Sequence, residues 1–274
     1  MKTISLEEFF SENKTVLEQW YSGISISRLE DELHSFLSNK RGSKKTFQTL
    51  ILKGIPLEQI NQKAYFYRSE FFVNEDVLIP RSETEILVED AINHIEKNYS
   101  PGYKVADIGV GSFCIGISIL IDVKKELYLW GGDICPKALK VAKQNLDKHK
   151  KSYHENSNVI LSLSDRLDRT EDKFNLIVSN PPYIREEKDR DGVHKQTLQF
   201  EPHLALFLPD EEFDMWFRKL FSSVKKKLES QGLFMMEGHE DTLDKLAVLA
   251  KEEFSNVEVK LDYTHRPRFL HCSN

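Results

Sequence analysis

The chain has 274 residues, of which 40% are hydrophobic and 30% are charged, a balance typical of a globular protein with one large and one small domain. Its net charge of −6 argues against a protein whose main task is to hold nucleic-acid phosphates, so we expect no direct nucleic-acid binding. The longest apolar run, residues 113–121, is far shorter than the ~20 residues of a membrane-spanning helix. The acidic first residues do not resemble a secretory signal. We therefore expect a cytoplasmic protein without membrane contact.

The N-terminal residues predict a small bundle of helices. Residues 5–8 read Ser-Leu-Glu-Glu, which has the form of a capping box, and apolar residues follow at helical spacing. Apolar residues also recur at helical spacing over 26–37, and a third helical segment covers roughly 46–53 before Gly54. Residues 1–62 are therefore expected to form a helical bundle without recognisable chemistry of its own.

A different pattern begins after this bundle. Residues 63–82 are rich in aromatic and β-branched side chains and predict a β-hairpin linker, with residues 74–76 (Asn-Glu-Asp) as the candidate turn. Residues 82–99 return to helical spacing, and Glu83 and Glu85 are placed where acidic side chains cap a helix.

From Lys104 onward, apolar runs alternate with helical segments, which is the pattern of a parallel sheet flanked by helices. Two short strands within residues 256–272 are separated by a polar turn and should form an antiparallel hairpin. For residues 83–274 we therefore predict an α/β, Rossmann-like fold with a mostly parallel sheet that ends in an antiparallel hairpin. The other candidate strands cover residues 104–109, 127–133, 158–164, 174–180 and 232–238.

The three cysteines, Cys114, Cys135 and Cys272, are scattered along the chain and form no Cys-x-x-Cys pair. This spacing favours neither a disulfide framework nor a structural zinc site. We therefore expect free cysteines and no metal.

The first predicted strand of the sheet leads into a loop that is suited to close contact with a ligand. Asp107 lies near the strand end, and Gly109 and Gly111 precede a helix-compatible apolar run. Glycines at such a position let backbone amides at a helix N-terminus approach a bound molecule. The complete dinucleotide fingerprint is absent, because Gly116 lies too late to supply its third glycine. The loop residues expected to contact a cofactor are Asp107, Gly109, Val110, Gly111, Ser112 and Phe113.

The next two strands end in carboxylates. Asp133 lies where a carboxylate meets ribose hydroxyl groups in nucleotide-binding α/β folds, and its spacing and position at the strand end favour this contact over a cap of the helix that follows. Asp165 is either a further contact or a turn residue. With their neighbours Ile134 and Arg166, these residues indicate an adenosine-bearing ligand across the carboxyl ends of the strands. Since neither a Walker lysine nor a full dinucleotide pattern is present, S-adenosylmethionine is the best candidate.

The fourth strand ends abruptly in a motif made of Asn180, Pro181, Pro182 and Tyr183. Prolines donate no backbone hydrogen bond, so the strand cannot continue through them. This motif resembles the (N/D)PPY motif of methyltransferases that act on planar amide or amino nitrogens. Three further segments resemble the HemK/PrmC family of protein-glutamine N5-methyltransferases, which modify translation release factors: VLIPRSETEILVE at 77–89, EPHLAL at 201–206 and RPRF at 266–269.

The resemblance covers roughly residues 73–268 and implies a class I methyltransferase fold with S-adenosylmethionine as cofactor. It also implies that the partner is a peptide chain release factor, methylated on the glutamine of its Gly-Gly-Gln loop for translation termination, with residues 1–62 recognising that substrate. Two departures stand out. Phe113 occupies a position where the family usually has a small residue, and Ser82 replaces a proline.

The motif predicts catalysis by positioning. A carboxamide nitrogen is a poor nucleophile, and no side chain at neutral pH could remove its proton beforehand. We expect the Asn180 side-chain oxygen and the Pro181 carbonyl each to accept an N–H of the substrate, which aims the nitrogen at the methyl group. Asn180 is also expected to contact the cofactor. Tyr183 is expected to pack against the planar group, and Glu201 to stabilise the loop after the motif through backbone hydrogen bonds.

Two alternatives stay open from the sequence. The same motif serves adenine-N6 methyltransferases that act on flipped-out bases of nucleic acid, which would require a basic groove that the acidic balance disfavours. The other alternative is a diverged, non-catalytic methyltransferase-like binding domain, which Phe113 permits and the intact motif opposes.

Overall fold

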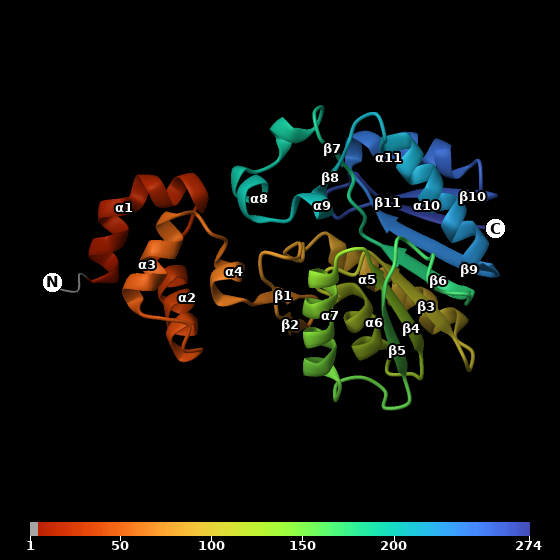
Figure 1. Ribbon diagram of the computed structural model, residues 1–274, viewed down its shortest axis with the longest axis horizontal. Coiled ribbons are helices and arrows are strands. Elements are labelled where there is room, and N and C mark those ends of the chain that lie inside the picture. Colours follow the sequence, from red (N-terminus) through yellow and green to blue (C-terminus); the bar gives the residue numbers. More distant parts are fainter. Residues whose placement is uncertain (1–4) are drawn as a thin grey trace.

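The computed structural model describes residues 5–274 and consists of a helical N-terminal part joined to a larger layered part (Figure 1). The first four residues of the expected bundle lie outside the described residues. The N-terminal helices are α1 (Leu6–Trp20), α2 (Ile26–Ser38), α3 (Lys44–Leu52) and the short α4 (Leu57–Asn61). They enclose a hydrophobic cluster of their own, which includes Leu17, Leu29, Phe36 and Phe47.

The predicted capping box at the start of α1 is confirmed. Ser5 Oγ accepts a hydrogen bond from Glu8 N, and a Glu8 carboxylate oxygen accepts one from Ser5 N. These two bonds satisfy backbone amides that the first turn of a helix leaves unpaired, which fixes where the helix begins.

The linker contains the expected hairpin, made of antiparallel strands β1 (Ala64–Phe66) and β2 (Ser69–Phe71). Its turn, however, is formed by Tyr67 and Arg68, so the prediction of a hairpin turn at 74–76 was wrong. Tyr67 adopts a φ of 54°, and its backbone N–H donates to Glu85 Oε1 at 2.9 Å. The turn contains no residue types that favour turns, and this hydrogen bond to the helix that contains Glu85 helps to stabilise it.

Helix α5 (Thr84–Asn98) follows the linker, and the expected caps are not the ones used. Glu83 is the N-cap residue but makes no side-chain capping bond, and the Glu85 carboxylate is bound to the Tyr67 amide instead. The helix is held by its buried face, since Leu87, Val88 and Ala91 are fully buried.

A seven-stranded sheet forms the centre of the larger part, and it confirms the predicted α/β, Rossmann-like fold. Its strand order is β10-β11-β9-β6-β3-β4-β5, and β11 is the strand that runs antiparallel to its neighbours. The predicted C-terminal hairpin is thus present, with its second strand inserted beside β9. The strands are β3 (Lys104–Ile108), β4 (Tyr128–Asp133), β5 (Asn158–Leu163), β6 (Phe174–Ser179), β9 (Leu228–Glu237), β10 (Asn256–Leu261) and β11 (Pro267–Ser273).

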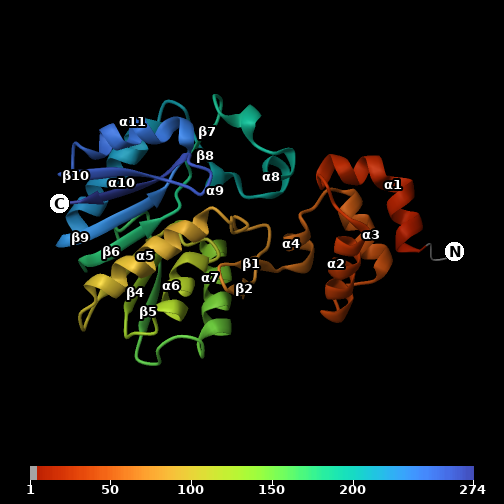
Figure 2. The ribbon, with the colours of Figure 1, turned by 180° about the vertical axis from the view of Figure 1, so that it is seen from behind.

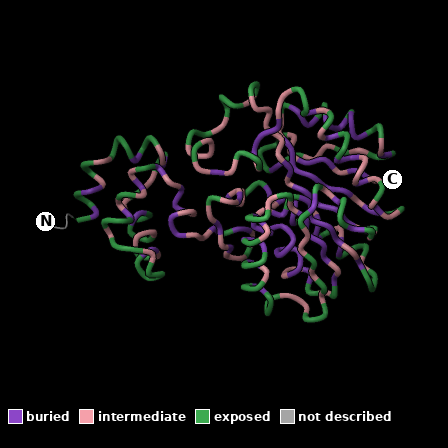
Figure 3. The backbone as a smooth tube through the Cα atoms, in the orientation of Figure 1, coloured by how far each residue is buried: buried purple, intermediate pink, exposed green. Residues whose placement is uncertain are grey.

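Helices cover both faces of this sheet (Figure 2). Alternate residues of β3 face opposite sides, so Val105 belongs to one hydrophobic cluster while Ala106 and Ile108 belong to the other. Buried segments accordingly concentrate in the strands of the layered part (Figure 3). One face is covered by α5, α6 (Cys114–Val123) and α7 (Pro136–His149), and the other by α10 (Phe213–Lys227) and α11 (Glu240–Ala250).

The segment after the proline motif leaves the sheet and returns to the N-terminal helices (Figure 1). Gln59 Nε2 donates to the Phe200 carbonyl at 2.8 Å, and Gln196 Nε2 donates to the Gly54 carbonyl at the same distance. The rings of Trp20 and Phe200 also meet edge to face. This segment contains β7 (Ile184–Arg185), the 3-10 turn Arg190–Gly192, α8 (Lys195–Phe200), α9 (His203–Leu206) and β8 (Phe207–Leu208), none of which the sequence predicted.

The cysteines are free, as expected, with Cys114 and Cys272 buried and Cys135 half-buried. Within residues 5–274, no helix combines the length and apolar character needed to span a membrane.

Candidate functional site

Two cavities meet at the proline motif. The first, called the strand-end cavity, has a volume of about 210 Å³ and is lined by residues that follow the carboxyl ends of β3, β4, β5 and β6. The second, called the motif cleft, has a volume of about 810 Å³ and is lined by the linker, the motif and the segment around α8. The residues that line both are Leu78, Pro80, Arg81, Asn180, Pro181 and Ala205.

The strand-end cavity exposes bare backbone in the loop after β3. Gly109 and Gly111 have positive φ angles of 74° and 50°, and a Cβ placed on either residue would meet no atom within 4 Å. A bound molecule can therefore approach the backbone of this loop closely.

Asp133, at the end of β4, fixes this loop from the opposite wall. Its Oδ2 accepts a hydrogen bond from Gly111 N at 2.9 Å, and its Oδ1 accepts one from Cys135 N at 2.8 Å. Neither bond is to the first turn of α7, so Asp133 does not cap that helix. Burial raises the pKa of this carboxyl, and the backbone amides that donate to it oppose that rise.

Asp165 and Arg166 form the rim of the same cavity. Both carboxylate oxygens of Asp165 accept from Arg166 Nη1, at 2.7 and 2.8 Å, and the guanidinium lies over the Trp216 ring. Asp165 stays largely exposed, unlike Asp133. The expected cofactor residues that line the cavity are Gly109, Val110, Gly111, Ser112, Asp133, Ile134, Asp165, Arg166 and Asn180.

Phe113 does not line the cavity, which corrects the expectation of a cofactor contact. Its side chain is fully buried, and a Cβ at Gly116 or Gly131 would lie 2.4 or 2.9 Å from its Cε2 atom. The ring thus fills the space that these two glycines leave in the core. Phe113 adopts a φ of 65° at the start of α6 and supports the loop from behind.

Asp107 also lies behind the cavity wall. It is fully buried, and its Oδ2 accepts a hydrogen bond from Gly116 N at 3.0 Å. Its Oδ1 has no hydrogen-bond partner among residues 5–274. Burial, the largest cause, raises the pKa of Asp107 to about 7. The residue thus anchors the start of α6 beneath the cavity.

The raised pKa of Asp107 predicts a pH-dependent stability. Between about pH 4, where an unfolded aspartate loses its proton, and about pH 7, the folded chain retains a proton that the unfolded chain has lost. Rising pH in this window therefore lowers the free energy of unfolding, by up to about 1.4 kcal/mol per pH unit. Asp107→Asn should lack this contribution, which urea unfolding of both proteins across the window measures. Parallel pH profiles of the two proteins would contradict the prediction.

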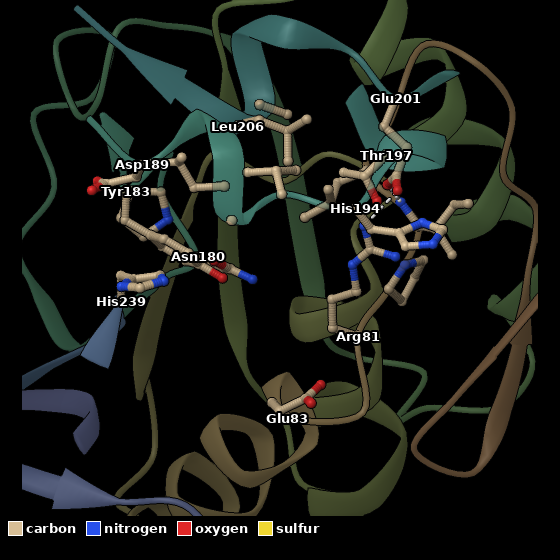
Figure 4. A pocket seen from close by; sticks show the side chains of 18 of the residues that line it. Arg81, Glu83, Asn180, Tyr183, Asp189, His194, Thr197, Glu201, Leu206 and His239 are labelled. Atoms are coloured by element: carbon tan, nitrogen blue, oxygen red, sulfur yellow. Dashed lines mark hydrogen bonds and ion pairs between the residues drawn. The ribbon is translucent and has the colours of Figure 1, made fainter. Parts of the chain in front are cut away.

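The proline motif lies at the end of β6 and is held by hydrogen bonds to two other elements. Asn180 Nδ2 donates to Thr84 Oγ1 at 3.2 Å, and Tyr183 donates from its hydroxyl to Glu237 Oε1 at 3.0 Å. Thr84 Oγ1 in turn donates to Glu237 Oε2 at 2.6 Å. Figure 4 looks into the motif cleft, with Asn180, Tyr183 and His239 on one side and Arg81 with Glu201 on the other.

Burial dominates the electrostatics beside the motif. It raises the pKa of Glu237, which hydrogen bonds from Thr84 and Tyr183 and the nearby Arg268 oppose. The pKa of the Tyr183 hydroxyl lies well above its ordinary value, through burial first and the Glu237 charge second. Tyr183 is therefore a neutral hydrogen-bond donor at physiological pH. The sequence did not single out Thr84 or Glu237, although Glu237 ends a predicted strand as Asp133 does.

Glu201 fastens the linker to the segment after the motif. Its Oε2 accepts from Ile79 N at 2.9 Å, and its Oε1 is paired with Arg81 Nη2 at 2.5 Å. The backbone hydrogen bond thus goes to the linker and not to the loop that Glu201 was expected to brace. Because Arg81 lines both cavities, this ion pair helps to shape the place where they meet.

A family model described as the methyltransferase small domain matches residues 83–202. The release factor glutamine methyltransferase of Flavobacterium psychrophilum is 33% identical over 220 residues, which are 78% of this chain and 74% of that protein. The protein of the same name from Clostridium acetobutylicum is 34% identical over 223 residues, which are 80% of this chain and 75% of that protein.

Solved structures share the fold at lower sequence identity. The hMettl16 catalytic domain in complex with the MAT2A 3'UTR hairpin 6 has a TM-score of 0.54 at 17% identity, and the match covers 74% of each chain. The T. thermophilus 16S rRNA N2 G1207 methyltransferase RsmC, in complex with AdoMet and guanosine, has a TM-score of 0.52 at 14% identity, covering 77% of this chain and 49% of that one. At these identities the likeness shows a common fold and no more.

Proposed function

This chain belongs to the family of release factor glutamine methyltransferases, and from that membership we propose that it transfers a methyl group from S-adenosylmethionine to the side-chain amide nitrogen of a glutamine in a peptide chain release factor. The acceptor would be the glutamine of that protein's Gly-Gly-Gln loop. The observation that carries the proposal is the meeting of the strand-end cavity and the motif cleft at Asn180 and Pro181. A methyl donor in one cavity and an amide in the other would face each other at these two residues.

The donor groups of the strand-end cavity fit S-adenosylmethionine. The bare backbone at Gly109 and Gly111 leaves room for a ligand against the loop, and Asp133 is placed to accept hydrogen bonds from ribose hydroxyl groups. Asp165 and Arg166 would border the bound molecule at the rim. When bound, S-adenosylmethionine supplies an electrophilic methyl group on its sulfonium.

The motif residues would orient the acceptor. The Asn180 side-chain oxygen makes no hydrogen bond with any of residues 5–274 and is available to accept one N–H of the substrate amide. The Pro181 carbonyl would accept the other, and its restricted φ holds that carbonyl still. Both acceptors favour the positive charge that grows on nitrogen during transfer, and alignment of the reacting atoms contributes several kcal/mol. One N–H proton of the methylated amide then leaves to solvent.

The side chains that line the motif cleft support a protein substrate over nucleic acid. Five carboxylates line this cleft against three lysine or arginine side chains, and such a balance disfavours contact with a phosphate backbone. Residues of the N-terminal part, Pro56 and Glu58, also line the cleft, which supports a role for residues 1–62 in substrate recognition. The carboxylates are those of Glu58, Glu83, Asp189, Glu201 and Asp241, and the cations are Arg81, Lys188 and Arg268.

Asp133→Asn is expected to weaken S-adenosylmethionine binding roughly 10- to 100-fold, because one acceptor oxygen of a buried, hydrogen-bonded carboxylate is replaced by a donor. Asp147→Asn is the matched control, since that carboxylate is exposed, pairs with Lys143 on the same helix and lines neither cavity. Its effect should stay within a few-fold. Calorimetric titration with S-adenosylmethionine measures both affinities, and an equal loss in the two variants would contradict the assignment of Asp133.

Labelled S-adenosylmethionine, offered with a purified release factor, a ribosomal protein or a DNA duplex, tests the proposed acceptor. Label on the release factor alone is the expected result. Label on DNA would favour adenine methylation and overturn the proposal. Binding of S-adenosylmethionine without label on any acceptor would favour a diverged, non-catalytic domain.

A further inference from the structure

Glu237 lies at the end of β9, beside the motif but outside it, and its surroundings are unusual for a carboxylate. The side chain is almost completely buried. Two hydroxyl groups are directed at it, one to each oxygen: Thr84 at 2.6 Å and Tyr183 at 3.0 Å. Buried carboxylates are retained only where such partners compensate for the loss of water. The Thr84 hydroxyl also contacts Asn180, so two hydrogen bonds connect Glu237 to the Asn180 amide through Thr84.

The order of these contacts fixes the direction of each hydrogen bond. The Thr84 hydroxyl donates its single proton to Glu237 Oε2, at 2.6 Å. The Thr84 oxygen then has only lone pairs left for Asn180, 3.2 Å away. The group of Asn180 that faces Thr84 must therefore be a donor, which is its NH₂ group. The amide oxygen must then face the other way.

From this arrangement we propose that Thr84 and Glu237 are positioning residues that set the direction of the Asn180 amide, so that its oxygen and not its nitrogen faces the substrate. The inference rests on the proposed function, because the substrate nitrogen is taken to be an amide NH₂. A carboxamide has nearly the same shape when turned by half a rotation, so packing alone distinguishes the two orientations poorly. If the Asn180 amide were turned the other way, its NH₂ group would face the NH₂ group of the substrate amide, and neither group could accept a hydrogen bond.

The three residues come from separate parts of the chain. Thr84 begins α5 directly after the linker, Asn180 follows β6, and Glu237 ends β9. Thr84 and Glu237 are 153 positions apart in sequence. Their contact therefore depends on the docking of the first turn of α5 against the carboxyl edge of the sheet, where Thr84 is buried. This assigns a specific task to a residue at the junction of linker and catalytic part.

The hydrogen bonds that connect Glu237 through Thr84 to Asn180 are called the relay. Thr84→Val tests the relay, because valine keeps the shape of threonine and removes the hydroxyl group. We expect kcat for release factor methylation to fall roughly 10- to 100-fold, with KM and the affinity for S-adenosylmethionine within about 3-fold of wild type. Thr84→Ser restores the hydroxyl group and should recover most of kcat. Tyr183→Phe is the matched comparison, since it removes the other hydroxyl donor to Glu237 but leaves the bond between Thr84 and Asn180 intact. It should lower kcat less than Thr84→Val does.

A loss of kcat in Thr84→Ser as large as in Thr84→Val would overturn the proposal, as would equal losses in Thr84→Val and Tyr183→Phe. An NMR measurement on the chain without substrate tests the relay independently of the proposed function. The Asn180 side-chain NH₂ signal, assigned by its absence in Asn180→Ala, should show magnetisation transfer to the side chain of residue 84 in wild type and in Thr84→Ser. If this transfer were absent in wild type, the relay would be refuted even if the release factor is methylated. If the transfer were present, it would support the relay even if the methylated glutamine belongs to a protein other than a release factor.

Discussion

Replacing Asn180 with alanine is expected to lower kcat for methyl transfer about 1,000-fold while the affinity for S-adenosylmethionine stays within a few-fold of wild type. The side chain removed is the one whose oxygen has no partner among residues 5–274 and whose NH₂ group is already bound to Thr84. The loss falls on kcat because the hydrogen bond to the acceptor nitrogen gains strength as positive charge develops there. Rapid-mixing kinetics and calorimetric titration measure the two quantities separately.

Asn98→Ala provides the control for this substitution. Asn98 is an exposed asparagine at the end of α5, and its side chain bonds only to the neighbouring turn. Its replacement should change neither kcat nor cofactor affinity. If Asn180→Ala instead reduced cofactor binding as strongly as it reduced methyl transfer, Asn180 would belong to the cofactor site, and the motif would need another explanation.

Phe113→Ala is expected to lower the free energy of unfolding by about 3–5 kcal/mol. The ring is fully buried and occupies the space beside Gly116 and Gly131, so its removal leaves a cavity in the packed core. Urea unfolding monitored by circular dichroism measures the change. S-adenosylmethionine should still bind to the folded variant, because the ring does not line the strand-end cavity.

Phe113→Gly separates packing from backbone strain at the same position. Phe113 has a φ of 65°, a conformation that costs an L-residue about 1 kcal/mol and costs glycine little. The glycine variant creates the same cavity but relieves the strain, so it should be about 1 kcal/mol more stable than Phe113→Ala. If the glycine variant were as stable as wild type, the ring would not be a necessary part of the core.

Local sequence patterns predicted the sheet well, because each strand carries its own signal. The strands β3 to β6 are short apolar runs between polar turns, and they form where those runs are. The position of β11 between β9 and β10 was not predictable in this way. Strand order depends on pairing between residues far apart in the chain, and periodicity contains no information about it.

The turn of the linker shows why turn propensity failed there. Residues 74–76 have the composition of a turn, and Asn74 Oδ1 does accept a hydrogen bond from Asp76 N at 3.1 Å. The hairpin nevertheless turns at Tyr67 and Arg68, whose residue types do not favour it. The Tyr67 amide is satisfied by Glu85, which lies 18 positions away in sequence. Only the folded chain brings that acceptor to the turn.

In the candidate site, too, the residues at strand ends were predictable from the sequence, whereas those placed by contacts between distant segments were not. Asp133 and Asn180 end strands, so their shared edge followed from the fold class, and both line the strand-end cavity. Phe113 was assigned by its place in the loop, whereas the direction of its side chain depends on Gly116 and Gly131. Thr84 and Glu237 escaped notice because their contact joins the start of α5 to the end of β9, a pairing without any signature in the sequence.

Mass-spectrometric mapping of the methyl group on a treated release factor identifies the acceptor atom directly. A purified release factor is incubated with this chain and S-adenosylmethionine, digested, and fragmented to locate the added methyl group. We predict one methyl group on the side-chain nitrogen of the glutamine in the Gly-Gly-Gln loop, and none when Asn180→Ala replaces the wild-type chain. A methyl group on another residue, or an unmodified loop in the presence of a chain that binds S-adenosylmethionine, would contradict it.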